Sequence, residues 1–276
     1  MKLSLSVRVA EKFNNKREID IDLPELSTIA QKAGYEALCM RASMVGIHSS
    51  PERILEVKHL IDQNHLAISM VTGDFAIPEN GLEGPDCLRQ ITPHLNLAEA
   101  LGCDLLRVCL KNESDIPFAQ RAADEAAERN MRLAHQCHTQ SLFETVDGSL
   151  STLAQINRAN FGIIYEPANL ALCGEPYHSE TIKAFEPYLF NVYLQNHVPD
   201  PKGSLPMTTW VNGVVHSTLR PLDEAGGIQF QHVFDGLKAI RYTGYITLHH
   251  AFGDEMPPNK AAQRSASFLK SFIDTH

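Results

Sequence analysis

No run of apolar residues in this 276-residue sequence is long enough for a membrane span, which needs about 20 of them. The first residues, MKLSLSVRVAEKFNNK, turn polar after about ten positions, too early for a secretory signal with its cleavage site. The six cysteines are scattered and form no C-x-x-C pair, which indicates reduced thiols. We therefore expect a cytoplasmic protein with no membrane partner.

Clustered positive charge is also lacking. The sequence has 24 Lys and Arg against 33 Asp and Glu, a formal net charge of −9, and no basic run. Because nucleic-acid binding needs a basic face, this balance argues against a nucleic-acid partner. No G-x-G-x-x-G, Walker A or G-x-S-x-G motif occurs. What remains is a protein that acts on a small molecule.

Short apolar runs alternate with longer amphipathic segments along the whole chain. Eight such runs with intervening helical patterns predict an α/β fold, a single (β/α)8 barrel. A doubly wound open sheet is the alternative, although it usually has fewer strands. No linker divides the chain, so we expect one domain over residues 1–276. The predicted strands are residues 3–9, 36–42, 67–73, 105–111, 132–138, 161–167, 191–197 and 245–251.

The connection before the last predicted strand is longer than the others. Residues 198–227 are rich in Pro and Gly and contain the only tryptophan, Trp210. A long structureless loop within a domain is usually functional. We expect this one to cover the carboxyl-terminal mouth of the barrel and to exclude water from the reaction.

Polar side chains follow the apolar part of the later strands. In FNVYLQNHVPD, alternation places Tyr193, Gln195 and His197 on one face of the strand. Active sites of such barrels lie at the carboxyl ends of the strands. Four acidic or imidazole side chains end four successive strands and are expected to converge, namely His138, Glu166, His197 and His249.

Imidazole and carboxylate together suit Zn, Mn, Fe or Co. Each residue also has a structural alternative. A single histidine at a strand end is often only hydrogen-bonded, and Glu166 can pair with Arg107 instead of a metal. Four such residues together favour a metal site.

Three arginines, Arg8, Arg41 and Arg107, lie on predicted strands 1, 2 and 4. They are equally consistent with binding a phosphate or carboxylate and with internal salt bridges. Asp74 and Glu144 are weaker acid–base candidates, and a loop or helix-cap role is favoured for both.

The pattern resembles the xylose isomerase-like TIM-barrel superfamily over nearly the whole chain. Its sugar isomerases and epimerases, inosose dehydratases and endonuclease IV-type enzymes share this barrel. The resemblance implies one divalent metal bound by Glu, Asp, His and Glu from the last four strands. The matching segments are LAHQCH with ETVD, YEPANL, NVYLQN, AGGIQF and RYTGYITLHH.

By this resemblance the four ligands fall on Gln136, Glu166, Tyr193 and His249, and only Glu166 keeps its chemical character. His138 and His197 are close enough in sequence to restore the ligand number. We expect one Mn, Co, Zn or Fe ion with the ligand set Gln136, Glu166, His197 and His249.

The resemblance implies an isomerase or epimerase that abstracts a proton beside the carbonyl of a carbohydrate substrate, with a homo-oligomer possible. A lyase of the inosose dehydratase or C-glycoside deglycosidase type and a non-catalytic sugar-binding barrel are the alternatives. An endonuclease IV-type function would need more ions and a basic surface. The expected catalytic residues are His138 and Glu166, and the expected substrate contacts are Arg41, Arg107, Tyr193, Gln195 and Trp210.

Overall fold

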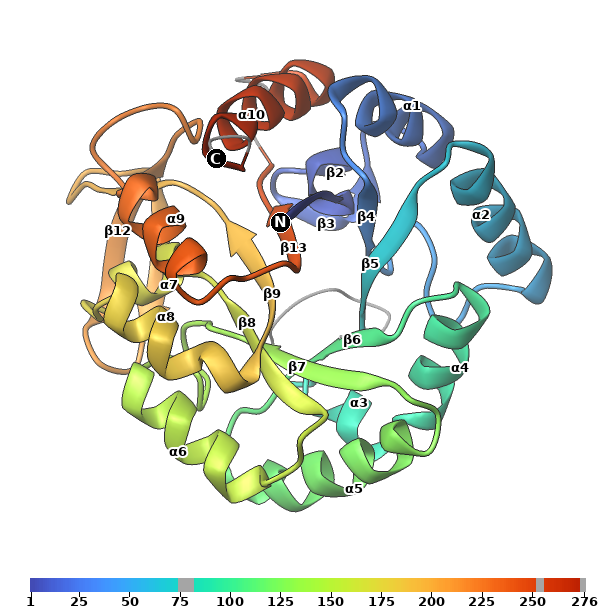
Figure 1. Cartoon of the computed structure of the whole chain (residues 1–276), viewed down its shortest axis with the longest axis horizontal. Helices are drawn as coiled ribbons and strands as arrows, with labels where there is room; N and C mark the ends of the chain where they lie inside the picture. Colours follow the sequence, from blue (N-terminus) through green and yellow to red (C-terminus); the bar gives the residue numbers. More distant parts are fainter. Residues whose placement is uncertain (74–81, 252–255, 274–276) are drawn as a thin grey trace.

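The computed structural model describes residues 1–73, 82–251 and 256–273 and shows a closed parallel barrel (Figure 1). β1 pairs in parallel with β13 through Leu3 and Ile246 and with β4 through Leu5 and Leu38, so the sheet has no free edge. This closure confirms the predicted (β/α)8 fold and excludes the open sheet. The barrel strands are β1 (Lys2–Ser6), β4 (Ala37–Met40), β5 (Ala67–Thr72), β6 (Leu105–Val108), β7 (Arg132–Gln136), β8 (Phe161–Tyr165), β9 (Leu189–Leu194) and β13 (Tyr245–Leu248).

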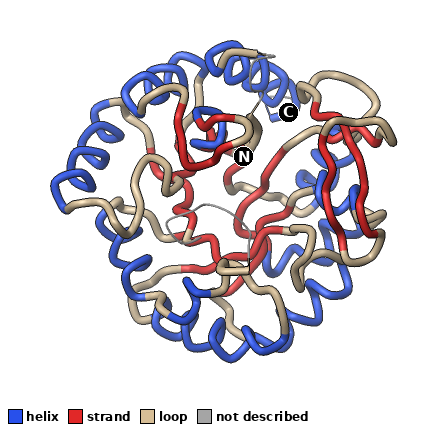
Figure 2. Tube along the Cα trace, turned by 180° about the vertical axis from the view of Figure 1, so that it is seen from behind, coloured by secondary structure: helices blue, strands red, loops and turns tan. Residues whose placement is uncertain are grey.

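Helices surround the barrel, as Figure 2 shows from behind. The local sequence sets their ends. Asp22 caps α1, which ends at Gly34 in the left-handed conformation (φ 83°), and Ser50 caps α2 just before Pro51. No helix in the described ranges is both long and apolar enough to cross a bilayer. The helices are α1 (Leu23–Ala33), α2 (Pro51–Gln63), α3 (Asp86–Arg89), α4 (Thr92–Ala100), α5 (Ile116–Ala127), α6 (Val146–Ile156), α7 (Pro167–Leu172), α8 (Ser179–Phe185), α9 (Phe230–Ala239) and α10 (Pro258–Ile273), with 3-10 turns η1 (Val7–Ala10), η2 (Glu113–Asp115) and η3 (Glu186–Tyr188).

The core has an outer and an inner part. Outward-facing strand residues pack against the helices in one large cluster. Inward-facing residues fill the barrel in a smaller cluster with Tyr193 as its largest member, so the barrel is packed rather than hollow. The inner cluster consists of Cys39, Met70, Leu105, Ala134, Ile164 and Tyr193.

The strands end earlier than the sequence predicts, and the chain after β1 forms a small hairpin. The first predicted strand, residues 3–9, stops at Ser6, whose side chain accepts a hydrogen bond from Arg8 N and caps η1. A two-stranded antiparallel hairpin follows, β2 (Glu11–Lys12) and β3 (Asn15–Ile19). Arg8 therefore lies in a 3-10 turn and not on a barrel strand.

The predicted structureless loop between β9 and β13 is the clearest correction. Much of it folds into an antiparallel sheet in the order β10–β12–β11, with β12 at one side of the barrel in Figure 1. The prediction of a loop was wrong because Pro and Gly were read as breakers, whereas β12 contains the strand-forming residues Val214, Val215 and Thr218. The strands are β10 (His197–Pro199), β11 (Leu205–Thr209) and β12 (Gly213–Leu219).

Candidate active site

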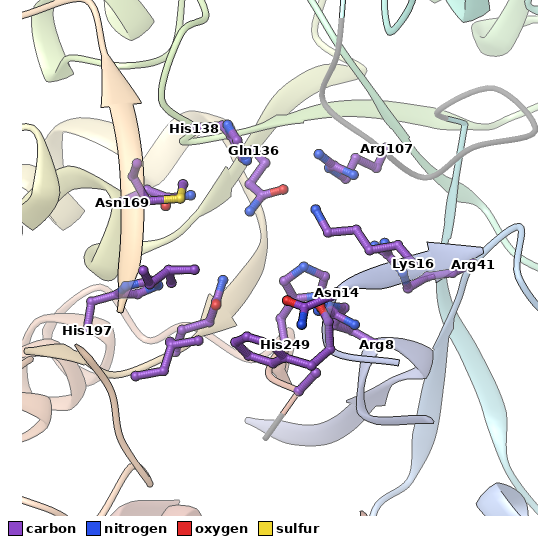
Figure 3. A pocket seen from close by; sticks show the side chains of 16 residues that line it. Arg8, Asn14, Lys16, Arg41, Arg107, Gln136, His138, Asn169, His197 and His249 are labelled. Atoms are coloured by element: carbon purple, nitrogen blue, oxygen red, sulfur yellow. The ribbon is translucent and has the colours of Figure 1, made fainter. Parts of the chain in front are cut away.

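A pocket opens at the carboxyl ends of the barrel strands, where the fold predicts an active site (Figure 3). The hairpin contributes Phe13, Asn14 and Lys16 to it, and the small sheet contributes Leu205, Met207 and Leu219. The residues expected from the sequence that line it are Arg41, Arg107, Gln136, His138, Gln195, His197 and His249.

Most of the site is one layer of side chains directly above the inner core. Alternation along a strand returns to the same face every second residue. Arg107 follows the core residue Leu105 by two positions, and Gln136 follows Ala134 in the same way. Arg41, Glu166 and Gln195 stand in the same relation to Cys39, Ile164 and Tyr193. The strand period thus explains why these polar side chains point into the barrel.

Glu166 lies beneath the pocket and is fully buried at the start of α7. Three amide groups donate hydrogen bonds to its carboxylate. Gln136 Nε2 and Asn169 Nδ2 donate to Oε2, the latter at 2.8 Å, and Gln195 Nε2 donates to Oε1. Asn169 also donates to Cys137 O at 2.8 Å. Because all three amides turn their NH2 groups toward Glu166, their carbonyl oxygens are directed away from it.

Burial raises the pKa of Glu166 to about 7, against the lowering effect of the Gln136 and Gln195 hydrogen bonds and of the Arg107 and Lys16 charges. The reason is that neutral amides compensate a buried carboxylate less well than a direct ion pair does. Glu166 therefore exchanges a proton near neutral pH, a property that favours acid–base chemistry.

The three pocket histidines are neutral imidazoles. Burial lowers the pKa of His138 to about 3 and that of His197 to about 4, and it places the pKa of His249 well below the usual value. His138 Nδ1 is 2.9 Å from Thr139 O, so we assign the proton to Nδ1 and the acceptor role to Nε2. His197 Nδ1 lies 2.9 Å from Ser217 Oγ, and His249 Nδ1 lies 3.0 Å from Ser6 Oγ.

The opposite side of the pocket is cationic. We call Arg8, Lys16, Arg41 and Arg107 the cation wall, and Gln136, His138, Asn169, Gln195, His197 and His249 the amide–imidazole wall. Figure 3 shows His138, Asn169 and His197 on the side opposite Arg41 and Lys16, with His249 next to Arg8.

Glu11 organises much of the cation wall. It accepts a hydrogen bond from Arg41 Nε at 2.8 Å and lies 3.6 Å from Arg8 Nη1. Arg8 also donates to Lys12 O at 3.0 Å and to Phe13 O at 2.8 Å. These bonds fix the turn of the hairpin and thereby position the strand that carries Lys16.

Several expected residues have other positions. Tyr193 is buried below the pocket, with its hydroxyl 3.1 Å from Cys39 Sγ and its ring stacked on His249 at 4.1 Å. Trp210 is 54% exposed, and neither residue is among the described side chains that line the pocket. Glu144 accepts hydrogen bonds from Trp210 N and Val211 N, which makes it a structural anchor of the β11–β12 turn.

Asp74 lies outside the described residues.

The three consecutive residues Gln195, Asn196 and His197 have three different roles. Gln195 holds Glu166, and His197 begins β10. Buried Asn196 donates to Pro221 O and Glu224 O at 3.0 and 2.9 Å, which secures the end of the long connection.

The side chains present do not fit a divalent cation well. In the described part of the chain, no three His, Cys, Asp or Glu side chains form a set that could hold a metal ion. Both oxygens of Glu166 already accept amide hydrogen bonds, and Tyr193 is below the pocket. Arg107 and Lys16 are close enough to influence the pKa of Glu166, and a divalent ion there would face their repulsion.

Sequence reasoning missed Lys16 and Asn169. Asn169 is part of the segment YEPANL, and its spacing of three from Glu166 on the first turn of a helix could have identified it. Lys16 lies in the polar stretch EKFNNKREI, where only the two-residue turn hints at a hairpin.

The sequence matches a family model described as xylose isomerase-like TIM barrel over residues 28–272. A search of curated protein sequences gave no match. Solved structures match over nearly their whole length. The probable 3-DHS dehydratase AsbF of Bacillus anthracis has a TM-score of 0.75 at 13% identity and covers 98% of this chain and 99% of that chain.

Two further structures of the same fold were solved with a bound ligand. The IOLI protein, solved with a bound zinc atom, has a TM-score of 0.74 at 15% identity, with 99% and 98% of the two chains covered. A D-allulose 3-epimerase from Methylomonas sp. in complex with D-allulose has a TM-score of 0.69 at 16% identity, with 98% and 96% covered. At such identities these likenesses establish the fold and not the activity.

Proposed function

Because the chain belongs to the xylose isomerase-like TIM barrel family, we propose that it is an enzyme that isomerises or epimerises a small carbohydrate or carbohydrate derivative. The reaction moves a proton on a carbon next to a carbonyl group. Neighbours of the same fold are described as an epimerase and a dehydratase, which supports an enzyme of this general kind.

The hydrogen-bonded group around Glu166 is the observation that carries the proposal. Three amides fixed by one buried carboxylate present carbonyl oxygens as acceptors, and a carbohydrate offers hydroxyl donors. The amides need no reorganisation when the substrate binds, because Glu166 has already oriented them. Gln136, Asn169 and Gln195 therefore hold the hydroxyl-bearing part of the substrate.

His138 is our proposed base, because the negative charge that forms on the substrate raises its pKa from the value of about 3 that burial gives it. Its Nε2 takes the proton from the carbon beside the carbonyl, and the electron pair of the broken C–H bond moves into an enediolate whose oxygen becomes negative. Arg107 lies on the facing wall, where its charge stabilises that oxygen. Return of the proton to the neighbouring carbon, with transfer of the hydroxyl proton from one enediolate oxygen to the other, gives an isomer. Protonation of the opposite face of the same carbon by a second donor on the facing side, with the first proton released to water, gives an epimer.

Elimination on the same scaffold is the second candidate, supported by the neighbour described as a dehydratase. The same carbanion would expel a hydroxyl group from the next carbon, and the proton held by His138 would leave with it as water. The two reactions share their first step and differ only in the fate of the electron pair.

Proton exchange in deuterated water tests this function. D-Allulose, D-fructose and D-glucuronate are each incubated with the enzyme and followed by NMR. We expect loss of a C–H signal for at least one of them, with a new sugar for an isomerase or epimerase and an unsaturated product for a lyase. Replacing His138→Gln should slow exchange by about 10²–10⁴-fold without loss of binding.

Binding without exchange or product would instead favour a non-catalytic sugar-binding barrel. Lys183→Gln, on the exposed surface of α8, is the control variant and should exchange like the unaltered protein.

The cytoplasmic location and the homo-oligomer expected from the sequence stay predictions. All six cysteines are free and buried, which supports a reducing compartment. The divalent metal is implied by the family resemblance alone. No step of the mechanism above passes through it, because the side chains present do not fit a metal ion well.

A further inference from the structure

We propose that the cation wall binds an anionic group of the substrate, a carboxylate or a phosphate, with Lys16 as its central contact. The inference rests on the proposed function, in which the amide–imidazole wall holds the hydroxyl-bearing part of a carbohydrate. It adds the chemical class of the substrate, namely a sugar acid or a sugar phosphate.

The charges around the pocket are unbalanced. Four cationic side chains line it, and no Asp or Glu occurs among the lining residues that the structure describes. Glu11, behind this surface, forms its ion pairs with Arg41 and Arg8, and Glu166 is enclosed by amides. Within the described ranges, positive charge thus exceeds negative charge on this side of the pocket.

Lys16 is the cation best placed for a ligand. It lies on β3, and in the described part of the chain its ammonium group has no hydrogen-bond or ion-pair partner. Figure 3 shows the side chain extended across the pocket, between Arg107 and Gln136. An ammonium group largely removed from water, with three unused donors, is energetically costly unless an anion accompanies it.

Neighbouring charges point the same way. Burial, followed by the charges of Arg41, Arg8 and Arg107, lowers the pKa of Lys16 to about 8, with Glu11 acting in the opposite direction. An anion in the pocket would oppose the effect of these arginines on the pKa of Lys16, since the charges that repel Lys16 attract the anion.

The hairpin makes the site rigid before a ligand arrives. The two hydrogen bonds from Arg8 to Lys12 O and Phe13 O fix its turn. The hydrogen bond between Glu11 and Arg41, the residue that follows β4, connects the hairpin to the barrel. A substrate with an anionic end and a hydroxyl-bearing end fits the two walls together. A neutral sugar would bring no anion to Lys16.

Three sugars that differ in one group provide the first test. Affinities for D-glucose, D-glucuronate and D-glucose 6-phosphate are measured by calorimetry at constant ionic strength. We expect at least one anionic sugar to bind about 10- to 100-fold more tightly than glucose, because hydrogen bonds to charged groups are the stronger ones. The tighter of the two identifies carboxylate or phosphate as the source of the charge.

Inorganic sulfate provides the second test, which does not depend on the choice of sugar. Sodium sulfate should raise the melting temperature above the value in sodium chloride of equal ionic strength. Lys16→Gln should remove both this rise and the preference for anionic sugars, whereas Lys16→Arg and the surface control Lys183→Gln should keep them. Since Lys16→Gln removes a buried charge, the variant is expected to fold.

Equal effects of sulfate on the unaltered protein and on Lys16→Gln would overturn the inference, as would equal affinity for glucose and both anionic sugars. The proposed function fails separately. A preference for anionic sugars without any proton exchange would support the anion site and contradict the proposed enzymatic function. Turnover of a neutral sugar without a preference for anionic sugars would support the enzymatic function and contradict the anion site.

Discussion

A buried carboxylate lies next to each of the two walls of the pocket, and the surroundings of the two carboxylates differ. Glu11 contacts guanidinium groups, at 2.8 Å from Arg41 and 3.6 Å from Arg8. The Glu166 carboxylate accepts its hydrogen bonds from amides among the described residues, and burial raises its pKa to about 7. A carboxylate between cations fixes their position, whereas one among neutral dipoles can take up and release a proton near neutral pH. The same residue type thus fixes charged groups behind one wall, whereas next to the other wall it orients amides and can exchange a proton.

Removing Glu11 tests the structural half of this comparison and should have the largest effect. Glu11→Ala leaves Arg8 and Arg41 buried without their carboxylate, so we expect a loss of about 3–5 kcal/mol in the free energy of unfolding. Urea unfolding measures it. Glu18→Ala, which breaks the exposed Lys12–Glu18 pair on the same hairpin, is the matched control and should change little. Similar losses in both variants would contradict the special position of Glu11.

Glu166→Gln tests the other half through pH. Folded Glu166 keeps its proton up to about pH 7, whereas the unfolded carboxyl releases it near 4.5, so the folded state binds more protons in between. This contribution to stability is therefore complete below about pH 4.5 and is lost as the pH rises to about 7, by up to about 3 kcal/mol.

Urea unfolding at several pH values should show that loss in the unaltered protein relative to Glu166→Gln. The exposed Glu180→Gln on α8 serves as the control and should retain the full pH dependence. Identical pH profiles for the unaltered protein and Glu166→Gln would show that Glu166 has no raised pKa.

The pH dependence of sulfate binding sharpens the description of the cation wall. Burial lowers the pKa of Lys16 to about 8, together with the charges of Arg41, Arg8 and Arg107, and Glu11 acts in the opposite direction. Lys16 is therefore charged below that pH and neutral above it. Sulfate affinity should therefore fall by about tenfold between about pH 7 and about pH 9. In Lys16→Arg the affinity should stay nearly constant over this range. A fall of the same size in that variant would assign the effect to another group.

Metal addition should have the smallest effect. We expect no uptake of one Mn, Co, Zn or Fe ion per chain at this site, because Glu166 is engaged by amides and the facing wall is cationic. Elemental analysis of protein purified without chelator and then titrated with each ion is the measurement. Uptake of one ion that is lost in Glu166→Gln would contradict this expectation and restore the ligand set implied by the family resemblance.

Alternation along the strands predicted the direction of the site residues well but not their depth. Gln136 and Gln195 were expected to point into the barrel, and both reach the pocket. Tyr193 has the same parity as Gln195 but lies one layer deeper, where it belongs to the core. A period of two cannot distinguish these layers, because depth depends on where each strand starts relative to its neighbours.

The cation wall was only partly predictable for a different reason. Its arginines were visible as charged residues in or near apolar runs. Lys16 comes from a short polar hairpin that depends on tertiary hydrogen bonds from Arg8 rather than on a hydrophobic pattern. The small sheet β10–β12–β11 escaped prediction similarly, because much of it is exposed and its turn is anchored by the distant Glu144.

Closure of the barrel has a consequence for the time at which the pocket first exists. The hydrogen bond between Ser6 and His249 joins residues 243 positions apart, and β1 completes the sheet only by pairing with β13. During synthesis on the ribosome, every member of the cation wall emerges long before His249 does. A nascent chain that ends before β13 therefore carries the charges and most of the facing side chains without the closed barrel that brings them together. Stabilisation by bound substrate can begin only when the last strand has been made, so the substrate protects finished protein and not the growing chain.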